Sequence, residues 1–460
     1  HELLRQYAGE QLVRSPDDLA RVYDRHTTYF ADFVAQCTLD FGAGAQAEAI
    51  QAMEGDLENI RAAWKWTVQQ LNFENFGKMA AGYSHVNEFK GRYLETREAL
   101  NRAVDLVQSN ITGNEQKELL VLLLALLGYS FIRVGRFEKA KNAFTESLEL
   151  LDQYGFSTPD GFGTDPMAGL AMVASIRGDY TNALGLAQES RQNNERQNLK
   201  LNLSISLYIL TDVSLALGNL DQARQYAQEA LLCTQETQNH WMMAYIFSFL
   251  GHLARADKDY EQAHQNYRAS FAIKESFNDP EGMAGAFNHL GYVAWLQKNY
   301  PQAEDLFQES LNLYRKTGDR GGLARTFNGL GIVACARHDY PAAQQNFLRA
   351  LQMTSDMRFV TLTLSVLVGI AEMMVQIERP ERSAELLSLV LNHPAIDRET
   401  SEQAKQYLSL CENKLSREQL EITTRPGAAI NLEDVIPELR VELAQPLPSD
   451  ARPERSGTTM

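Results

Sequence analysis

The side chains best suited to holding another molecule recur at regular intervals over the middle of this 460-residue chain. They are aromatic rings, amides, hydroxyls, arginines, a histidine and a carboxylate, which a peptide backbone and its side chains can use as contact surface and hydrogen-bond partners. The set is Tyr208, Asp212, Tyr245, Ser248, His252, Arg255, Asn288, Tyr292, Trp295, Arg325 and Asn328. We expect the set to line one groove, with packing against neighbouring helices as the alternative for Tyr292 and Trp295.

Catalytic motifs are absent from the sequence. It has no phosphate-binding loop of the Gly-x-x-x-x-Gly-Lys-Ser/Thr type, no His-Glu-x-x-His and no Gly-x-Ser-x-Gly. Asp40-Phe41-Gly42 and Gly42-Ala43-Gly44 resemble kinase and dinucleotide motifs, but the surrounding elements of those motifs are missing, which indicates loops. The nine histidines are dispersed, and His252 and His264 are expected on different helices. The sequence therefore predicts a protein that is not an enzyme, with no metal and no cofactor.

Composition narrows the classes of partner. With 44% hydrophobic residues, 22% charged residues and a net charge of −16, the chain is expected to fold and to make no contact with nucleic acid. The uncharged run from Leu119 to Ile132 has 14 residues, whereas a membrane span needs about 20, so a buried helix and no membrane contact are expected. Four widely separated cysteines suggest no disulfide framework and a cytoplasmic location; they are Cys37, Cys233, Cys335 and Cys411.

An internal repeat organises most of the chain. Six alanines are spaced 43 residues apart once and 40 residues apart thereafter: Ala140, Ala183, Ala223, Ala263, Ala303 and Ala343. In four of the units a Leu-Gly pair ends twelve residues before the alanine and an aromatic residue follows four residues after it, as with Gly331 and Phe347 around Ala343. A residue without a side chain opposite a large one suits two helices packed closely together. Extending the period to Thr96 and Ser383 predicts eight units between about residues 75 and 415.

This pattern of Leu-Gly, Gly-x-Tyr, alanine and an aromatic residue resembles the tetratricopeptide repeat. The resemblance implies an all-α, right-handed α-solenoid of about eight helix pairs over residues 75–416. The period near 40 residues, instead of the 34 typical of the family, is similar to that of MalT-like repeat domains. In the family, the groove lined by the first helices binds protein segments or peptides.

The beginning of the chain carries a second resemblance. The run from His1 to Ala8, followed by Arg25 to Phe30 and Glu54 to Trp64, resembles the end of a winged-helix region and the linker helices after it in signal-transduction ATPases with numerous domains, the STAND or NB-ARC type. It implies a winged-helix end at residues 1–15, linker or capping helices at 16–74, and a nucleotide-sensing role for His1 together with an upstream domain. The alternative is a helical cap that protects the first repeat.

The last 44 residues differ from the repeats. Five of the thirteen prolines lie after residue 425, so we expect a disordered tail over residues 417–460, within which Ile430 to Ala444 forms either one short helix or a partner-binding segment.

Three functions are compatible with these patterns. The first is the C-terminal sensor and scaffold of a STAND-type regulatory ATPase, in which a protein, a peptide or a small-molecule inducer binds the repeats and controls oligomerisation of the full-length parent. Because the chain starts at His1 without an initiator Met, we expect it to be part of such a longer protein. The second is a stand-alone adaptor that joins protein partners. The third, an enzyme, has no motif to support it.

Overall fold

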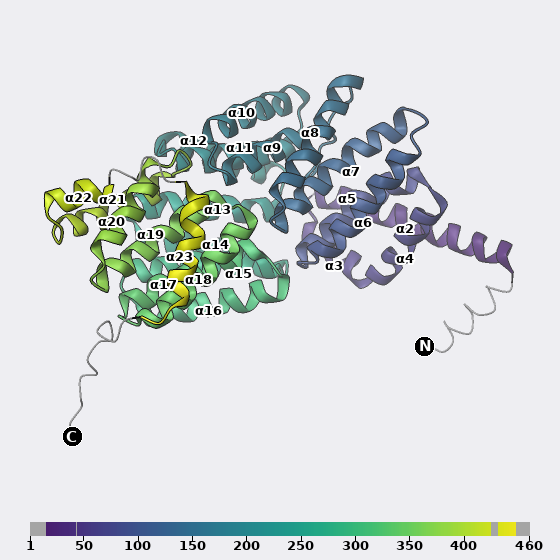
Figure 1. Ribbon diagram of the computed structural model, residues 1–460. Helices are drawn as coiled ribbons and strands as arrows, with labels where there is room; N and C mark the ends of the chain where they lie inside the picture. The colour runs from purple at the N-terminus through teal and green to yellow at the C-terminus, as the bar shows by residue number, and fades with distance from the viewer. Residues whose placement is uncertain (1–14, 43, 425–430, 448–460) are drawn as a thin grey trace.

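Helices account for all the regular structure in the computed structural model, which describes residues 15–42, 44–424 and 431–447 (Figure 1). The run from His1 to Ala8 lies outside the described residues, and of the winged-helix end predicted for residues 1–15 the structure describes residue 15 alone. The N-terminal helices are α2 (Pro16–Gly42), α3 (Gln46–Gly55) and α4 (Leu57–Gln70). They pack against the first repeat, where the rings of Trp64 and Tyr83 stack with centroids 4.9 Å apart.

Eight consecutive helix pairs follow, in agreement with the eight units of the sequence repeat. The pairs are α5 (Phe73–Phe89) with α6 (Tyr93–Ser109), α7 (Asn114–Arg133) with α8 (Phe137–Tyr154), α9 (Pro166–Ile176) with α10 (Tyr180–Gln197), α11 (Lys200–Ala216) with α12 (Leu220–Glu236), α13 (His240–Ala256) with α14 (Tyr260–Ser276), α15 (Pro280–Leu296) with α16 (Tyr300–Thr317), α17 (Arg320–Ala336) with α18 (Tyr340–Met357), and α19 (Val360–Gln376) with α20 (Pro380–Asn392). The expectation of an α-solenoid is confirmed.

Glycine and aromatic residues fix the spacing of these helices. A Cβ atom at Gly331 would lie 2.5 Å from Cε1 of Phe347, and one at Gly369, in the following pair, would lie 2.6 Å from the same atom. The ring of Phe347 therefore fills a slot between the first helices of two successive pairs, and only glycine leaves room for it. Ala343, one turn before Phe347, is fully buried and brings the helices of the pair together.

The turns inside the pairs repeat with the same period. Lys258, Lys298 and His338 each adopt a left-handed conformation, with φ between 61° and 62°. The second helix of each pair begins two residues later. The first turn of that helix has free N–H groups, and the side chains of Asp259 and Asp339 accept hydrogen bonds from them. Similar turns give the two helices of each pair a similar arrangement, and a small rotation from one pair to the next makes such an array curve.

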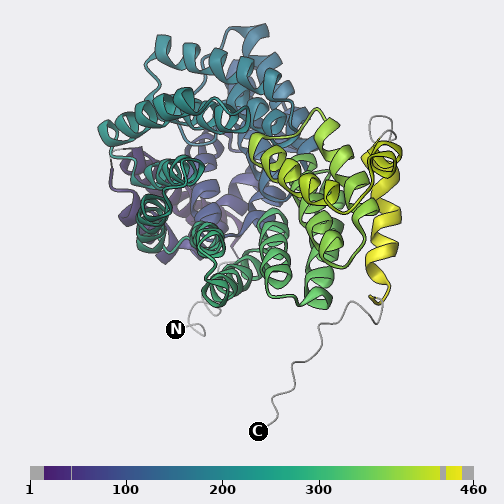
Figure 2. The same ribbon diagram turned by 90° about the vertical axis from the view of Figure 1, so that its left-hand side faces the viewer.

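The curvature brings distant repeats together, and Figure 2 shows the helices arranged around a ring. The rings of Phe89 and Phe277 stack with centroids 5.8 Å apart, and those of Phe137 and Phe359 meet edge to face at 5.5 Å. Thr361 donates a hydrogen bond of 3.2 Å to the carbonyl of Ile176. The solenoid is therefore wound tightly enough for one turn of the superhelix to pack on the next.

The described residues of the tail that was expected to be disordered are mostly helical, and the short helix that the sequence allowed over residues 430–444 is among them. After α21 (Arg398–Glu412), the chain forms α22 (Arg417–Thr424) and α23 (Leu432–Ala444), and α23 lies against α18. Proline content suggested disorder, but apolar residues three to four positions apart give α23 one apolar stripe, which covers the end of the last repeats. The buried residues of that stripe are Leu432, Val435, Leu439 and Leu443.

The uncharged run from Leu119 to Ile132 lies within α7, where most of its side chains are buried in the core. None of the helices described here is long and apolar enough to cross a membrane.

Candidate ligand-binding cavity

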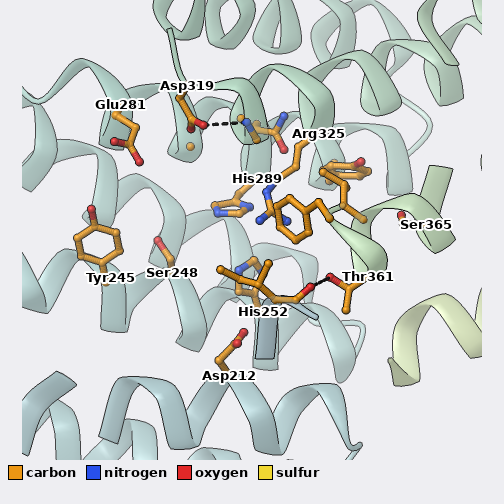
Figure 3. A pocket seen from close by; sticks show the side chains of 18 of the residues that line it. Asp212, Tyr245, Ser248, His252, Glu281, His289, Asp319, Arg325, Thr361 and Ser365 are labelled. Carbon is orange, nitrogen blue, oxygen red and sulfur yellow. Dashed lines mark hydrogen bonds between the residues drawn. The ribbon is translucent and has the colours of Figure 1, made fainter. Parts of the chain in front are cut away.

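The inner faces of the first helices enclose a cavity of about 480 Å³ (Figure 3). Its walls come from four consecutive pairs, through α11, α13, α15 and α17, and from α7, α19 and α21 on neighbouring parts of the superhelix. The second helices of the pairs contribute fewer lining residues, among them Lys274 on α14 and Tyr314 on α16.

Nine of the eleven side chains expected to line a groove do line this cavity: Tyr208, Asp212, Tyr245, Ser248, His252, Arg255, Asn288, Tyr292 and Arg325. The other two do not. Asn328 is buried, 3.5 Å from the hydroxyl of Tyr292 and 3.4 Å from that of Ser365. Trp295 packs against the core of the C-terminal repeats, which is the alternative left open for it from the sequence.

Two histidines occupy the middle of the cavity. The rings of His252 and His289 meet at right angles with centroids 4.5 Å apart, and Nδ1 of His252 lies 2.8 Å from the hydroxyl of Tyr267. Burial, with the nearby positive charges of Arg255 and Arg325, lowers the pKa of His289 to about 3. Burial, with His289 and the same arginines, also holds the pKa of His252 well below its usual range. Both rings are therefore neutral near pH 7.

Ion pairs across the cavity join helices that are far apart in sequence. Arg133 on α7 donates hydrogen bonds to Glu88 at 2.8 Å and to Glu281 on α15 at 2.9 Å. Tyr93 also donates to Glu281. On the other side, Arg255 on α13 pairs with Glu399 on α21 at 2.6 Å. Burial, with the charges of Asp319 and Glu88, raises the pKa of Glu281 well above its usual range.

A lysine lies in an aromatic setting on the cavity wall. Nζ of Lys274 is 3.3 Å from the ring centroid of Tyr245, 4.2 Å from that of Trp241 and 3.4 Å from Oδ2 of Asp279. The side chain is 2% exposed, and this burial lowers its pKa to about 7. The ammonium group is held by one carboxylate and two ring faces.

Sequence reasoning missed several lining residues, among them Lys274, Glu281, His289, Asp319 and Glu399. Asp319 and Glu281 lie at the start of first helices, so the recurrence of those starts could have indicated them. Glu399 reaches the cavity only because the superhelix closes, and the repeat pattern carries no signal for that contact. The described residues contain no cluster of three or more potential metal ligands.

Comparisons with known proteins identify the type of repeat and a similar fold. Residues 282–356 match the family model described as the tetratricopeptide repeat. No curated protein matches the chain. Among solved structures, a Rap protein complexed with competence and sporulation factor is similar to this chain at a TM-score of 0.56 and 14% identity, over 83% of this chain and 99% of that one. At this identity the likeness concerns the fold.

Two further solved structures are similar at lower TM-scores. The Rap conjugation gene regulator of the plasmid pLS20, in complex with the Phr* peptide, has a TM-score of 0.45 and 12% identity over 76% of this chain and 96% of that one. A STAND protein with a tetratricopeptide repeat sensor from Pyrococcus horikoshii has a TM-score of 0.43 and 14% identity over 75% of this chain and 55% of that one.

The helix pairs, their period and the match to residues 282–356 define the class of protein: this chain is an α-solenoid of tetratricopeptide-like repeats. Arrays of this class are scaffolds for protein interaction, and their concave surfaces bind without catalytic groups.

Proposed function

We propose that the chain is a non-catalytic sensor module that binds a peptide or an extended protein segment in the cavity inside its superhelix. One observation carries the proposal: nine regularly spaced side chains from four consecutive repeats line a single cavity of about 480 Å³. Binding sites for small ligands have volumes of about 300–1,000 Å³. The Rap structure, similar in fold and complexed with competence and sporulation factor, supports a ligand-binding role.

The second part of the proposal concerns the longer protein to which this module belongs. The resemblance of His1 to Ala8 to STAND proteins favours a cytoplasmic regulatory ATPase, in which ligand binding to the repeats controls oligomerisation and output. The intact mass of the native product, with the reading frame upstream of His1, tests this part. A phosphate-binding loop upstream supports it. A native chain that starts near His1 overturns it and leaves a stand-alone adaptor.

Blocking the cavity tests the binding role. Gly285 lines the cavity, and a Cβ there has only the hydroxyl of Tyr314 within 4 Å, at 3.3 Å. Gly285→Phe should therefore fill the cavity with little effect on the helix. Gly185, on the exposed face of α10 with no atom within 4 Å of a Cβ, provides the matched control Gly185→Phe.

The measurement is capture of peptides from a random heptapeptide pool by the purified chain. The wild type and Gly185→Phe should retain the same peptides, and Gly285→Phe should retain few or none. Equal capture by all three would contradict binding inside the superhelix. Circular dichroism of each variant shows whether its fold is preserved.

A further inference from the structure

The basic side chains of the cavity differ in whether they form an ion pair. Four of them line its wall: Arg133, Lys274, Arg255 and Arg325. The first three have acidic partners, described above at distances between 2.6 and 3.4 Å. Arg325 has no ion pair and no hydrogen bond of its side chain within the described parts of the chain.

The guanidinium of Arg325 is nevertheless held in position. It lies over the ring of Phe359, with its central carbon 5.0 Å from the ring centroid, and Phe359 is itself buried. A guanidinium stacked on an aromatic face keeps its N–H groups free at the edge of its plane, where they can bind a planar anion through two parallel hydrogen bonds. Because Arg325 is exposed within the cavity, an incoming group can reach it.

The surroundings add uncharged donors to this cation. Figure 3 shows His252, His289 and Arg325 close together near the middle of the cavity, with Asp319 and Glu281 on one side and Asp212 on another. The lowered pKa values of the two imidazoles favour their neutral forms, in which each ring has one N–H. When the Tyr267 hydroxyl donates to Nδ1 of His252, the N–H of that ring is on Nε2 and is free for another partner. The charge of Arg325 acts on Asp212 and Asp319 and favours their ionised forms, although neither forms an ion pair with it among the described residues.

The charged side chains of the cavity wall limit the charge of an anion that can bind there. Against four basic side chains, the cavity has five acidic ones, namely Asp212, Glu281, Asp319, Asp397 and Glu399. Burial raises the pKa of the first four, so the cavity disfavours negative charge. A singly charged carboxylate on Arg325 adds less of it than a doubly charged group and still gains one strong ion pair.

We propose that Arg325 is the anchor for a carboxylate of the bound peptide, next to His252 and His289. This inference rests on the proposed peptide-binding function. Two sources supply the group: the C-terminal carboxylate of the peptide, or an Asp or Glu side chain.

Three random heptapeptide pools distinguish the sources. One has free C-termini and no Asp or Glu, one has amidated C-termini with Asp and Glu included, and one has amidated C-termini without either residue. The wild type should retain peptides from at least one carboxylate-containing pool about tenfold better than from the uncharged pool, which corresponds to one charge-assisted hydrogen-bonded pair.

A matched pair of variants assigns the effect to the residue. Arg325→Gln should remove the tenfold preference. Arg349, whose guanidinium lies 5.4 Å from the ring centroid of Phe327 and which does not line the cavity, is stacked in the same way, and Arg349→Gln should keep the preference. Arg325→Lys should retain part of it, because it keeps the charge and loses the planar fork.

The outcomes separate the two proposals. Capture of all three pools with equal affinity, or a preference that survives in Arg325→Gln, overturns the role of Arg325 and leaves peptide binding standing. Failure of the wild type to retain any peptide from any pool overturns the proposed function, and the role of Arg325 with it.

Discussion

Lys274 shows what enclosure inside the superhelix does to a single residue. Its ammonium group is nearly excluded from water, and the rings of Trp241 and Tyr245 replace most of its hydration. The charged form is disfavoured in such a place, so the folded chain holds the lysine proton less tightly than the unfolded chain does. Burial of this group therefore costs stability at and below neutral pH.

The sign of the pH dependence follows from the two pKa values. The pKa is about 7 in the folded chain, against a usual value of 10.5. Between these pH values the unfolded chain binds more protons, so the contribution of Lys274 to the free energy of unfolding should rise with pH. Urea unfolding of wild type and Lys274→Met at pH 6, 7, 8 and 9 measures it. The advantage of Lys274→Met should be largest at pH 6 and shrink steadily; a constant difference would contradict the lowered pKa.

At the scale of the element, glycine at particular positions determines how closely the helices can pack. Gly331 is needed because the ring of Phe347 occupies the space of a Cβ, whereas Gly185 in α10 faces open space. Gly331→Ala should lower the free energy of unfolding by about 1–3 kcal/mol through overpacking. Gly185→Ala should raise it by about 0.5–1 kcal/mol, because alanine favours the helix. Thermal or urea unfolding of both variants checks this, and the same sign of change in both would contradict the packing account.

The repeat was predictable from the sequence because each of its parts is local. Ala343, Gly331 and Phe347 meet within one helix pair, so their spacing records the contact directly. The inward faces of the first helices could be predicted for the same reason, which is why most of the expected side chains line the cavity. Trp295 and Asn328 do not line the cavity, and for Trp295 packing against neighbouring helices was the alternative left open. Spacing along a helix does not distinguish an inward position from one that faces the adjacent helix.

The sequence left open whether α23 forms, because it allowed either a short helix or a partner-binding segment between Ile430 and Ala444. Pro437 lies inside the helix, and the apolar stripe of the helix gains stability only from the surface of the last repeats. Arg382 also pairs with Glu442 on α23 at 3.1 Å. Contacts of this kind depend on where the array ends in space, which local composition does not record.

At the scale of the whole molecule, closure of the superhelix joins distant repeats that would unfold separately in an open array. In an open array each repeat contacts only its neighbours, and unfolding can proceed in segments. Here one hydrophobic core contains Phe30 from the N-terminal helices and Phe89 from the first repeat, together with Trp241, Phe277 and Phe359 from later repeats. Closure also brings α21 to the cavity, a feature that no period in the sequence encodes.

A disulfide across the closure tests it. A Cβ at Gly218, in the turn after α11, would lie 3.6 Å from Cβ of Arg398 on α21, within the range of about 3.5–4.5 Å found in disulfides. Gly218→Cys combined with Arg398→Cys should therefore form an intramolecular disulfide on mild oxidation, at some cost because Gly218 has φ of 81°.

Thiol counting after oxidation provides the readout. The four native cysteines are buried and free, so under denaturing conditions the oxidised double variant should show four thiols and each single variant five. Six thiols in the oxidised double variant would mean that the two parts of the superhelix do not meet.

The location of the ligand is the central claim, and photo-crosslinking tests it most directly. A benzophenone amino acid replaces Ser248 on the cavity wall in one variant and Gly185 on the outer face of α10 in another. Irradiation with peptides captured from the random pool should yield a covalent peptide adduct at position 248 and none at position 185. Adducts at position 185 with none at position 248 would show that peptides bind outside the superhelix and would contradict the account.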